Sequence, residues 1–308
     1  MIPSRSSYLV FGQPDFAEAQ IDEVVATLRS RWVGTGPRVA RFETEFAAYV
    51  GLPDHHASAV GSCTAALQLA MATAGVQPGD EVITSSMTFC ATANAIIHTG
   101  AKPVLVDIDP HSMNLCPEKV AQRITPKTRA LVPVHFAGLP CDMSALMALA
   151  EKHELLVIED CAHAIESRTQ NRHTGTFGHF GCYSFYATKN LTTAEGGMVV
   201  CRREEDAAAI RSLALHGLSK DAWKRCRDEG YQHYLLEQCG YKCNMTDLQA
   251  SLGIHQLARI EERLLRREAI WLRYQQAFEK LPLQRPEEPP SDVRHARHLY
   301  TIRIPEGR

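Results

Sequence analysis

One lysine in this sequence has neighbours that suit covalent chemistry. Lys189 lies between an apolar, strand-like run at 182–186 and the Gly-Gly pair at 196–197. An amine that follows a buried strand is partly desolvated, which lowers its pKa and makes it nucleophilic, as an imine bond to a carbonyl cofactor requires. The hydroxyl groups around it could hold an anion such as a phosphate: Ser184, Thr188, Thr192 and Thr193. Taken alone, the segment also fits a surface lysine between a strand and a loop.

A second segment offers a place for a phosphate. Residues 61–66 (Gly-Ser-Cys-Thr-Ala-Ala) form a turn of small residues that leads into a helical pattern. Free backbone N–H groups at a helix N-terminus, together with the hydroxyls of Ser62 and Thr64, would form a phosphate cradle. The same residues also fit an ordinary helix N-cap.

A third segment brings a carboxylate to the end of an apolar run. Asp160 follows the run at 154–159, and His163 lies three residues further on. A carboxylate next to a pyridine nitrogen keeps that nitrogen protonated, as the chemistry of pyridoxal 5′-phosphate (PLP) requires. His163 could then bond the phenolic oxygen of the cofactor. The alternative is that Asp160 caps a helix and His163 is a satisfied polar residue.

An aromatic residue, Phe89, follows the apolar run at 81–84. Its ring could stack on a flat heterocycle, or it could fill the hydrophobic core.

The elements that must position these side chains alternate between strand and helix patterns. We expect strands at 58–60, 81–84, 103–107, 129–134, 154–159, 182–186 and 197–201. We expect helices at 15–30, 39–50, 64–75, 88–98, 117–123, 142–153, 203–216 and 246–280. This alternation predicts an α/β fold with a mainly parallel sheet and helices on both faces. Ligands of such sheets bind beyond the carboxyl ends of the strands, where Asp107, Asp160 and Lys189 fall.

The last part of the chain is less regular. Residues 218–240 are predicted to form a loop, and 282–292 form a proline-rich linker. The alternating pattern at 295–305 predicts a final strand. Because nothing follows that strand to pair with it, we expect a C-terminal piece to be missing or replaced by something else.

Composition excludes several classes of function. The chain has 308 residues, of which 45% are hydrophobic, and its net charge of −2 gives no support for a nucleic-acid partner. No window approaches the roughly 20 apolar residues of a membrane span. Ten scattered cysteines without a CxxC pair indicate reduced thiols in a cytoplasmic protein. Cys239 and Cys243 with His233 come nearest to a metal cluster, and we interpret them as structural, so no metal is predicted. No G-x-G-x-x-G motif follows the first strand, which argues against a dinucleotide-binding enzyme.

The order of motifs resembles the DegT/StrS family of PLP-dependent sugar aminotransferases, which have fold type I. The resemblance covers nearly the whole chain and rests on Trp-Val-Gly-Thr-Gly-Pro at 32–37, Gly-Ser-x-Thr-Ala-Ala at 61–66, Thr-Phe-x-Ala-Thr-Ala-Asn-Ala at 88–95, Glu-Asp-x-Ala-His-Ala at 159–164, Ser-Phe-x-Ala-Thr-Lys-Asn-Leu-Thr-Thr-x-Glu-Gly-Gly at 184–197 and the segment 240–250.

The resemblance implies a role for each matching residue. Lys189 would bind PLP covalently, Asp160 would pair with the pyridine nitrogen and Phe89 would stack on the ring. His163 would lie near the ring oxygen. The phosphate would be held by Ser62, Cys63, Thr64 and Ser184. Asn244, and more loosely Lys242, would complete that pocket in the neighbouring subunit of a homodimer with shared active sites.

The sequence departs from the family at two places. Cys63 replaces a glycine in the phosphate-binding loop. Relatives also continue for several tens of residues beyond Arg308. We therefore expect a large PLP-binding domain at 1–250, including N-terminal helices at 15–50, and an incomplete small α+β domain at 251–308.

The resemblance implies transfer of an amino group from an amino acid, most plausibly glutamate, to a nucleotide-linked keto-sugar in amino-sugar or cell-surface polysaccharide biosynthesis. C4 is the expected position, and a 3-keto sugar is the close alternative. A related branch of the family carries histidine in place of the lysine and dehydrates sugars, so Lys189 argues against that activity. Two rival functions are a PLP-binding regulator without turnover and a lyase that acts on small amino acids.

Overall fold

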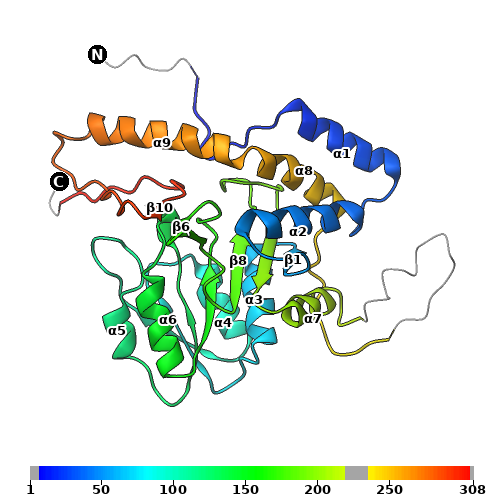
Figure 1. Ribbon diagram of the computed structural model, residues 1–308, viewed down its shortest axis with the longest axis horizontal. Coiled ribbons are helices and arrows are strands. Elements are labelled where there is room, and N and C mark those ends of the chain that lie inside the picture. The colour runs from blue at the N-terminus through cyan, green and yellow to red at the C-terminus, as the bar shows by residue number, and fades with distance from the viewer. Residues whose placement is uncertain (1–6, 219–234, 306–308) are drawn as a thin grey trace.

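The computed structural model describes residues 7–218 and 235–305. Its centre is a seven-stranded sheet (Figure 1). The strand order is β1 (Ala57–Val60), β9 (Gly197–Cys201), β8 (Phe180–Ser184), β5 (Leu156–Asp160), β4 (Thr128–Val132), β2 (Glu81–Ser85) and β3 (Lys102–Val106). Neighbouring strands from β8 to β3 are parallel, whereas β9 is antiparallel to both β8 and β1. The predicted mainly parallel sheet is confirmed.

Helices cover both faces of this sheet. One face carries α3 (Cys63–Thr73), α4 (Cys90–His98) and α7 (Glu204–Ala214). The other face carries α5 (Pro117–Ala121) and α6 (Met143–Lys152) at the β3 side, and α2 (Pro37–Val50) and α8 (Asp247–Ala258) at the β1 side. Successive residues of a strand point to opposite faces, so Ile158 packs in the first layer and Val157 in the second.

Aromatic rings join α2 to the strand that leads to Lys189. Phe42 packs against Phe185 with ring centroids 5.3 Å apart, and Phe46 against Tyr183 at 4.9 Å. All four side chains are fully buried. Burial of each side chain contributes roughly 1.5–3 kcal/mol, so the end of β8 has a well-fixed position.

The single helix expected at 246–280 is wrong, because the chain forms two helices there. α8 ends at Ala258 and α9 (Ile260–Ala277) begins beyond Arg259, whose φ of −108° is not helical. The N–H of Arg259 donates to the carbonyl of Gln256, three residues back instead of four. α1 (Glu18–Ser30) packs on α8. The expected domain boundary between 250 and 251 lies inside α8, and the division into two domains stays a prediction.

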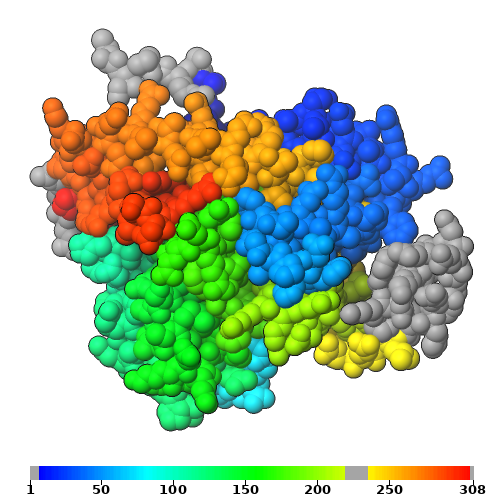
Figure 2. Space-filling view, in the orientation of Figure 1, coloured from blue at the N-terminus to red at the C-terminus, as the bar shows by residue number. Residues whose placement is uncertain are grey.

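The final strand expected at 295–305 is also wrong. Its start bonds to a turn, where Ala296 N donates to the carbonyl of Gly138 at 2.9 Å in the 3-10 turn η1 (Phe136–Gly138). Near its end, Arg303 forms a single antiparallel bridge with Gln284, with both backbone hydrogen bonds at 2.9 Å. In Figure 2 this C-terminal segment, in red, lies beneath α9, in orange. Its apolar side chains Ile302 and Ile304 are 43% and 64% exposed, so the alternation does not mark a buried strand. A small sheet that the sequence patterns did not indicate lies nearby, formed by β10 (Val293–Arg294), β6 (Arg168–Thr169) and β7 (Arg172–His173).

Three remaining expectations concern loops, thiols and membranes. Most of the loop expected at 218–240, and His233 with it, lies outside the described residues. Every cysteine that the structure describes is a free thiol. Within the described ranges, no helix is long and apolar enough to cross a membrane.

Two buried histidines predict a loss of stability in acid. Burial, assisted by Arg168, lowers the pKa of His173 from 6.5 to about 4, and burial with Arg297 lowers that of His295 to about 3. Both rings stay neutral in the folded protein, whereas the unfolded chain takes up protons below pH 6.5. Lowering the pH should therefore decrease the free energy of unfolding. Near pH 5 the decrease should be about 1–2 kcal/mol per histidine. Urea unfolding measured as a function of pH tests this, and His173→Gln should flatten the slope. A slope that is unchanged in that variant would contradict the assignment.

Candidate active site

Lys189 lies in the loop between β8 and β9. The loop is tied to the strand ends by Lys189 N to Tyr186 O, Thr193 N to Phe185 O and Phe185 N to Gly196 O, each at 2.9 Å. The Lys189 side chain is half-buried, and its amine bonds to none of the described residues. Burial lowers the pKa of this amine, although Asp160 and Cys63 act in the opposite direction. A larger uncharged fraction makes the amine a better nucleophile.

Asp160 ends β5 and is buried close to Lys189. Its Oδ2 accepts a hydrogen bond from Thr92 Oγ1 at 2.7 Å, and its Oδ1 accepts one from Ala162 N at 3.1 Å. Burial raises the pKa of the carboxyl, while these two bonds and the Lys189 charge lower it. The carboxylate is thus held by fixed donors, in an orientation suited to pairing with a cationic ring nitrogen.

The sequence motifs did not indicate two threonines that support Asp160, one of them directly and the other through its neighbour. Thr88 Oγ1 lies 2.7 Å from Thr92 Oγ1, which in turn donates to Asp160. Thr92 lies in the first turn of α4, and Thr88 lies just before the N-cap Phe89, so the turn into the helix brings the two hydroxyls together. The spacing of four residues could have indicated that the two threonines lie close together. It could not have identified Asp160 as the carboxylate that they contact.

The predicted phosphate cradle lies where α3 meets β9. Ser62 is the N-cap of α3, and its Oγ accepts a hydrogen bond from Ala65 N at 3.1 Å. The N–H groups of Cys63 and Thr64 have no acceptor among the described residues, which leaves them free for an anion.

A glycine brings β9 directly against this cradle. A Cβ atom at Gly197 would lie 2.5 Å from the carbonyl carbon of Ser62 and 2.7 Å from Cys63 N. Gly197 pairs with Ser184 across the sheet, and directly paired residues point to the same face, so the buried Ser184 side chain is directed to the face on which the cradle lies. The structure therefore brings together the candidate phosphate-binding residues Ser62, Cys63, Thr64 and Ser184.

His163 and Phe89 also lie at this edge of the sheet. Burial, with a smaller effect of Lys189, lowers the pKa of His163 to about 3, so its ring is neutral. Its Nδ1 is buried and has no partner among the described residues. Phe89 is the N-cap of α4 and is 75% exposed, so the core-filling alternative is wrong. An exposed ring at this place is available for stacking.

Asn244 lies beside the start of the cradle within the same chain. Its backbone forms a bridge with Val60, and Cys243 O accepts from Gly61 N at 2.7 Å. The Asn244 side chain donates to Thr35 Oγ1 at 2.6 Å and accepts from Lys242 Nζ. Its reach into a second subunit stays a prediction.

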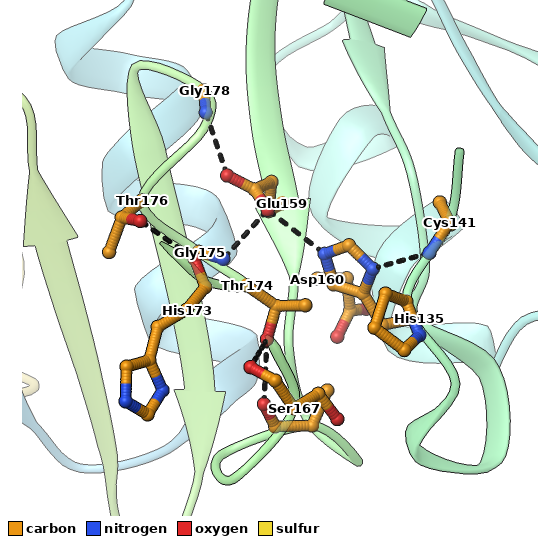
Figure 3. Close-up of polar contacts among 12 residues, drawn as sticks. His135, Cys141, Glu159, Asp160, Ser167, His173, Thr174, Gly175, Thr176 and Gly178 are labelled. Carbon is orange, nitrogen blue, oxygen red and sulfur yellow. Dashed lines mark hydrogen bonds and ion pairs between the residues drawn. The ribbon is translucent and has the colours of Figure 1, made fainter. Parts of the chain in front are cut away.

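Beneath the site, Glu159 organises a buried polar network (Figure 3). It accepts hydrogen bonds from the N–H groups of Gly175 and Gly178, both at 2.7 Å, and lies 3.0 Å from His135 Nε2. His135 Nδ1 accepts from Cys141 N at 3.0 Å, so the ring proton is on Nε2 and points to Glu159. His135, Glu159 and Cys161 are close enough to form a metal site, but these bonds already occupy both ring nitrogens and the carboxylate. We therefore interpret the cluster as a structural support for β5.

The residues present fit PLP. The start of α3 offers unpaired N–H groups for a phosphate, and Asp160 offers a fixed carboxylate for a pyridine nitrogen. Lys189 offers an unbonded amine for an aldehyde, and the buried Nδ1 of His163 still lacks a partner. Lys189 would hold PLP covalently, and the other residues would fix its two ends.

Comparisons with known proteins agree with this site. The chain matches a family model described as the DegT/DnrJ/EryC1/StrS aminotransferase family over residues 14–308. The spore coat polysaccharide biosynthesis protein SpsC of Bacillus subtilis is 50% identical over 306 residues, which cover 99% of this chain and 78% of SpsC.

Solved structures are similar in fold as well. The PLP form of the putative sugar aminotransferase Spr1654 from Streptococcus pneumoniae is 36% identical, with a TM-score of 0.89, and the match covers 97% of this chain and 78% of that one. The aminotransferase TlmJ from Streptoalloteichus hindustanus is 35% identical, with a TM-score of 0.89, covering 95% and 78%.

The family resemblance inferred from the motifs is confirmed by these matches, and so are fold type I and the cofactor. The sheet order places the lysine loop after β8 next to the end of β5, where Asp160 lies, and the role of these residues in holding the cofactor stays a prediction. This chain belongs to the DegT/DnrJ/EryC1/StrS aminotransferase family and is a PLP-dependent aminotransferase.

Proposed function

We propose that this protein transfers the amino group of an amino acid, glutamate, to C4 of a nucleotide-linked keto-sugar. The observation that carries the proposal is the half-buried Lys189 amine, which lies near the fixed carboxylate of Asp160 and has no hydrogen bond to the described residues. The names of the similar proteins support a sugar acceptor, and that of SpsC supports a role in polysaccharide biosynthesis.

We assign the cofactor contacts as follows. Ser62, Thr64, Ser184 and the N–H of Cys63 hold the phosphate. Asp160 keeps the pyridine nitrogen protonated, and Phe89 stacks on the ring. Neutral His163 donates a hydrogen bond to the phenolic oxygen.

When bound, PLP supplies an aldehyde carbon that exchanges nitrogen and a protonated ring that takes up electron density. Lys189 would hold the cofactor through that carbon. Because burial lowers the pKa of the Lys189 amine, this amine could act as the base that moves a proton from the α-carbon of the amino acid. Asp160 stays charged and stationary throughout, and His163 stays neutral.

We further propose that two copies of the chain form the working enzyme. The arm at the beginning of the described chain exposes large apolar side chains, including Tyr8 at 88% and Phe11 at 79%, and Phe89 is also exposed. Such surface is costly to leave in water and suits a second copy, whose Asn244 would complete the phosphate pocket. The free thiols of the described chain agree with a cytoplasmic location.

The test is transfer of isotope-labelled amino nitrogen. The full chain, loaded with PLP, is incubated with labelled glutamate and a panel of UDP-, dTDP- and GDP-linked 3-keto and 4-keto sugars. We expect the label in one 4-amino sugar, with 2-oxoglutarate formed in equal amount and no product from Lys189→Ala.

A labelled 3-amino sugar would replace the C4 assignment by the C3 one. Absence of transfer to every sugar, with PLP bound, would contradict the proposed activity and favour a regulator. Breakdown of the amino acid without transfer would favour a lyase.

A further inference from the structure

A second histidine lies over the candidate site from the far end of the chain. The backbone N–H groups of His298 and Leu299 donate to the carbonyl of Ala137 at 3.1 and 3.2 Å. This places the His298 ring on that of His163, with centroids 4.4 Å apart and planes inclined by 33°. Neither the sequence motifs nor the cofactor contacts involve His298.

The amide of Asn190, the residue next to Lys189, sets the orientation of that ring. Asn190 Nδ2 donates to Glu166 Oε2 at 2.9 Å and to Ala296 O at 3.1 Å. Both of these groups are acceptors, so the reversed amide would bring oxygen against oxygen. Asn190 Oδ1 must therefore face His298 Nδ1, 2.9 Å away, and that nitrogen must carry the proton.

The Asn190 amide is itself held from α9. Arg267 forms an ion pair with the fully buried Glu166, and its Nε donates to Ala296 O at 3.2 Å. The chain Arg267–Glu166–Asn190–His298 thus connects α9, the loop after β5, the lysine loop and the C-terminal segment. Because Glu166 is fully buried, loss of Arg267 would leave its charge without its cationic partner, so this ion pair fixes the orientation of the amide.

The remaining nitrogen of His298 is free to accept a hydrogen bond. Nε2 has no partner among the described residues and, unlike Nδ1 of His163, it is not sealed from solvent. Burial, followed by His163, Lys189, Arg267 and His295, keeps the pKa of His298 well below its ordinary value. No carboxylate bonds to the ring, and the bonded acceptor is a neutral amide. Nε2 is therefore an uncharged acceptor on the open side of the ring.

We propose that His298 is a positioning residue of this site, which Asn190 holds in the Nδ1–H tautomer so that Nε2 accepts an N–H or O–H group of the substrate beside Lys189. The role in binding rests on the proposed function, whereas the tautomer does not. The donor could be the amino acid or a hydroxyl of the sugar, and the two half-reactions distinguish them.

The first test reads the tautomer and uses no substrate. Imidazole nitrogen chemical shifts of the PLP-loaded protein should show His298 with the proton on Nδ1, its signals being identified by their loss in His298→Asn. In Asn190→Asp a carboxyl group faces Nδ1, so His298 should become a cation at a higher pH than in the wild type. The acidic limb of the activity profile should move in the same direction. A proton on Nε2 in the wild type, or an unchanged titration in a folded Asn190→Asp, overturns the proposal.

The second test separates the two nitrogens of the ring. His298→Asn keeps a donor at the position of Nδ1 and loses Nε2, whereas His298→Gln brings an amide oxygen near the position of Nε2. We expect KM to rise about three- to tenfold in His298→Asn, for the amino acid or for the sugar, with kcat changed less and partial recovery in His298→Gln. The exposed His111, replaced by asparagine, is the control and should leave both KM values unchanged.

Each outcome of the second test has a definite meaning. A higher KM for one substrate supports the proposal and identifies the donor. Unchanged KM values for both substrates in a folded His298→Asn overturn it. If no sugar is aminated at all, the proposed function fails, but the nitrogen shifts still decide the tautomer.

Discussion

Lys189→Ala should abolish the visible absorbance of the lysine-bound cofactor and lower the turnover rate by at least about 10⁴-fold, because nucleophile and base are lost together. The fold should persist, since the amine bonds to no described residue and β8 is fixed by its aromatic packing. Absorbance spectra and single-turnover rates at saturating PLP measure the effect. Normal absorbance in the variant would contradict the assignment of Lys189.

A mixture of two inactive variants examines the shared site. If Asn244 serves the neighbouring subunit, hybrids of Lys189→Ala and Asn244→Ala contain one intact site each. If the subunits of the two variants pair at random, half of the dimers are hybrids. The mixture should then have about a quarter of the wild-type activity. Cys239→Ala, at an exposed position earlier in the same segment, is the control and should leave the activity unchanged. A mixture no more active than its components would place Asn244 outside the partner's site.

Asp160→Asn should slow the first half-reaction by about 10²–10³-fold while leaving the cofactor-free protein as stable as before. The neutral amide cannot hold the ring nitrogen in its protonated form, so a fixed electrostatic contribution is lost. Stability should not fall, because burial raises the pKa of the Asp160 carboxyl and its charge is unfavourable without a cation beside it. Stopped-flow absorbance after addition of amino acid gives the rate, and thermal melting gives the stability.

The matched control is Thr92→Val, which removes the hydroxyl that donates to Asp160 and keeps the charge. It should have a smaller effect than Asp160→Asn, of about tenfold. An equal rate in wild type and Asp160→Asn would show that the carboxylate does not act on the ring.

The elements around the cofactor could be predicted because their causes are local. Strand β5 is an apolar run that ends in Asp160, and α3 begins at the N-cap Ser62. The strand and the start of the helix are each determined by residues that are close together in the sequence. The helix break at Arg259 was not predictable, because both sides of it have good helix-forming sequence and tertiary packing decides where the axis changes.

The parts of the site that were missed depend on contacts between distant segments. His298 belongs to an alternating pattern that indicates a strand, yet its backbone bonds to Ala137, whose φ is +56°. Asn190 is separated from Ala296 by 106 positions along the chain. Polar pairs at that separation leave no periodic signal in a sequence.

The loop that carries Lys189 is held by one segment from near the beginning of the chain and by another from near its end. Gly12 packs on Thr188, where a Cβ would come within 2.7 Å, and His298 bonds to Asn190 on the other side of Lys189. Loops of more than a hundred residues must close before these contacts form, and closures of that length come late in folding. During synthesis, the sheet and the phosphate cradle can fold while the ribosome is still adding α9. The contacts that hold the loop on both sides of Lys189 are complete only after residue 298 has been added, so this loop should be among the last parts of the site to become ordered.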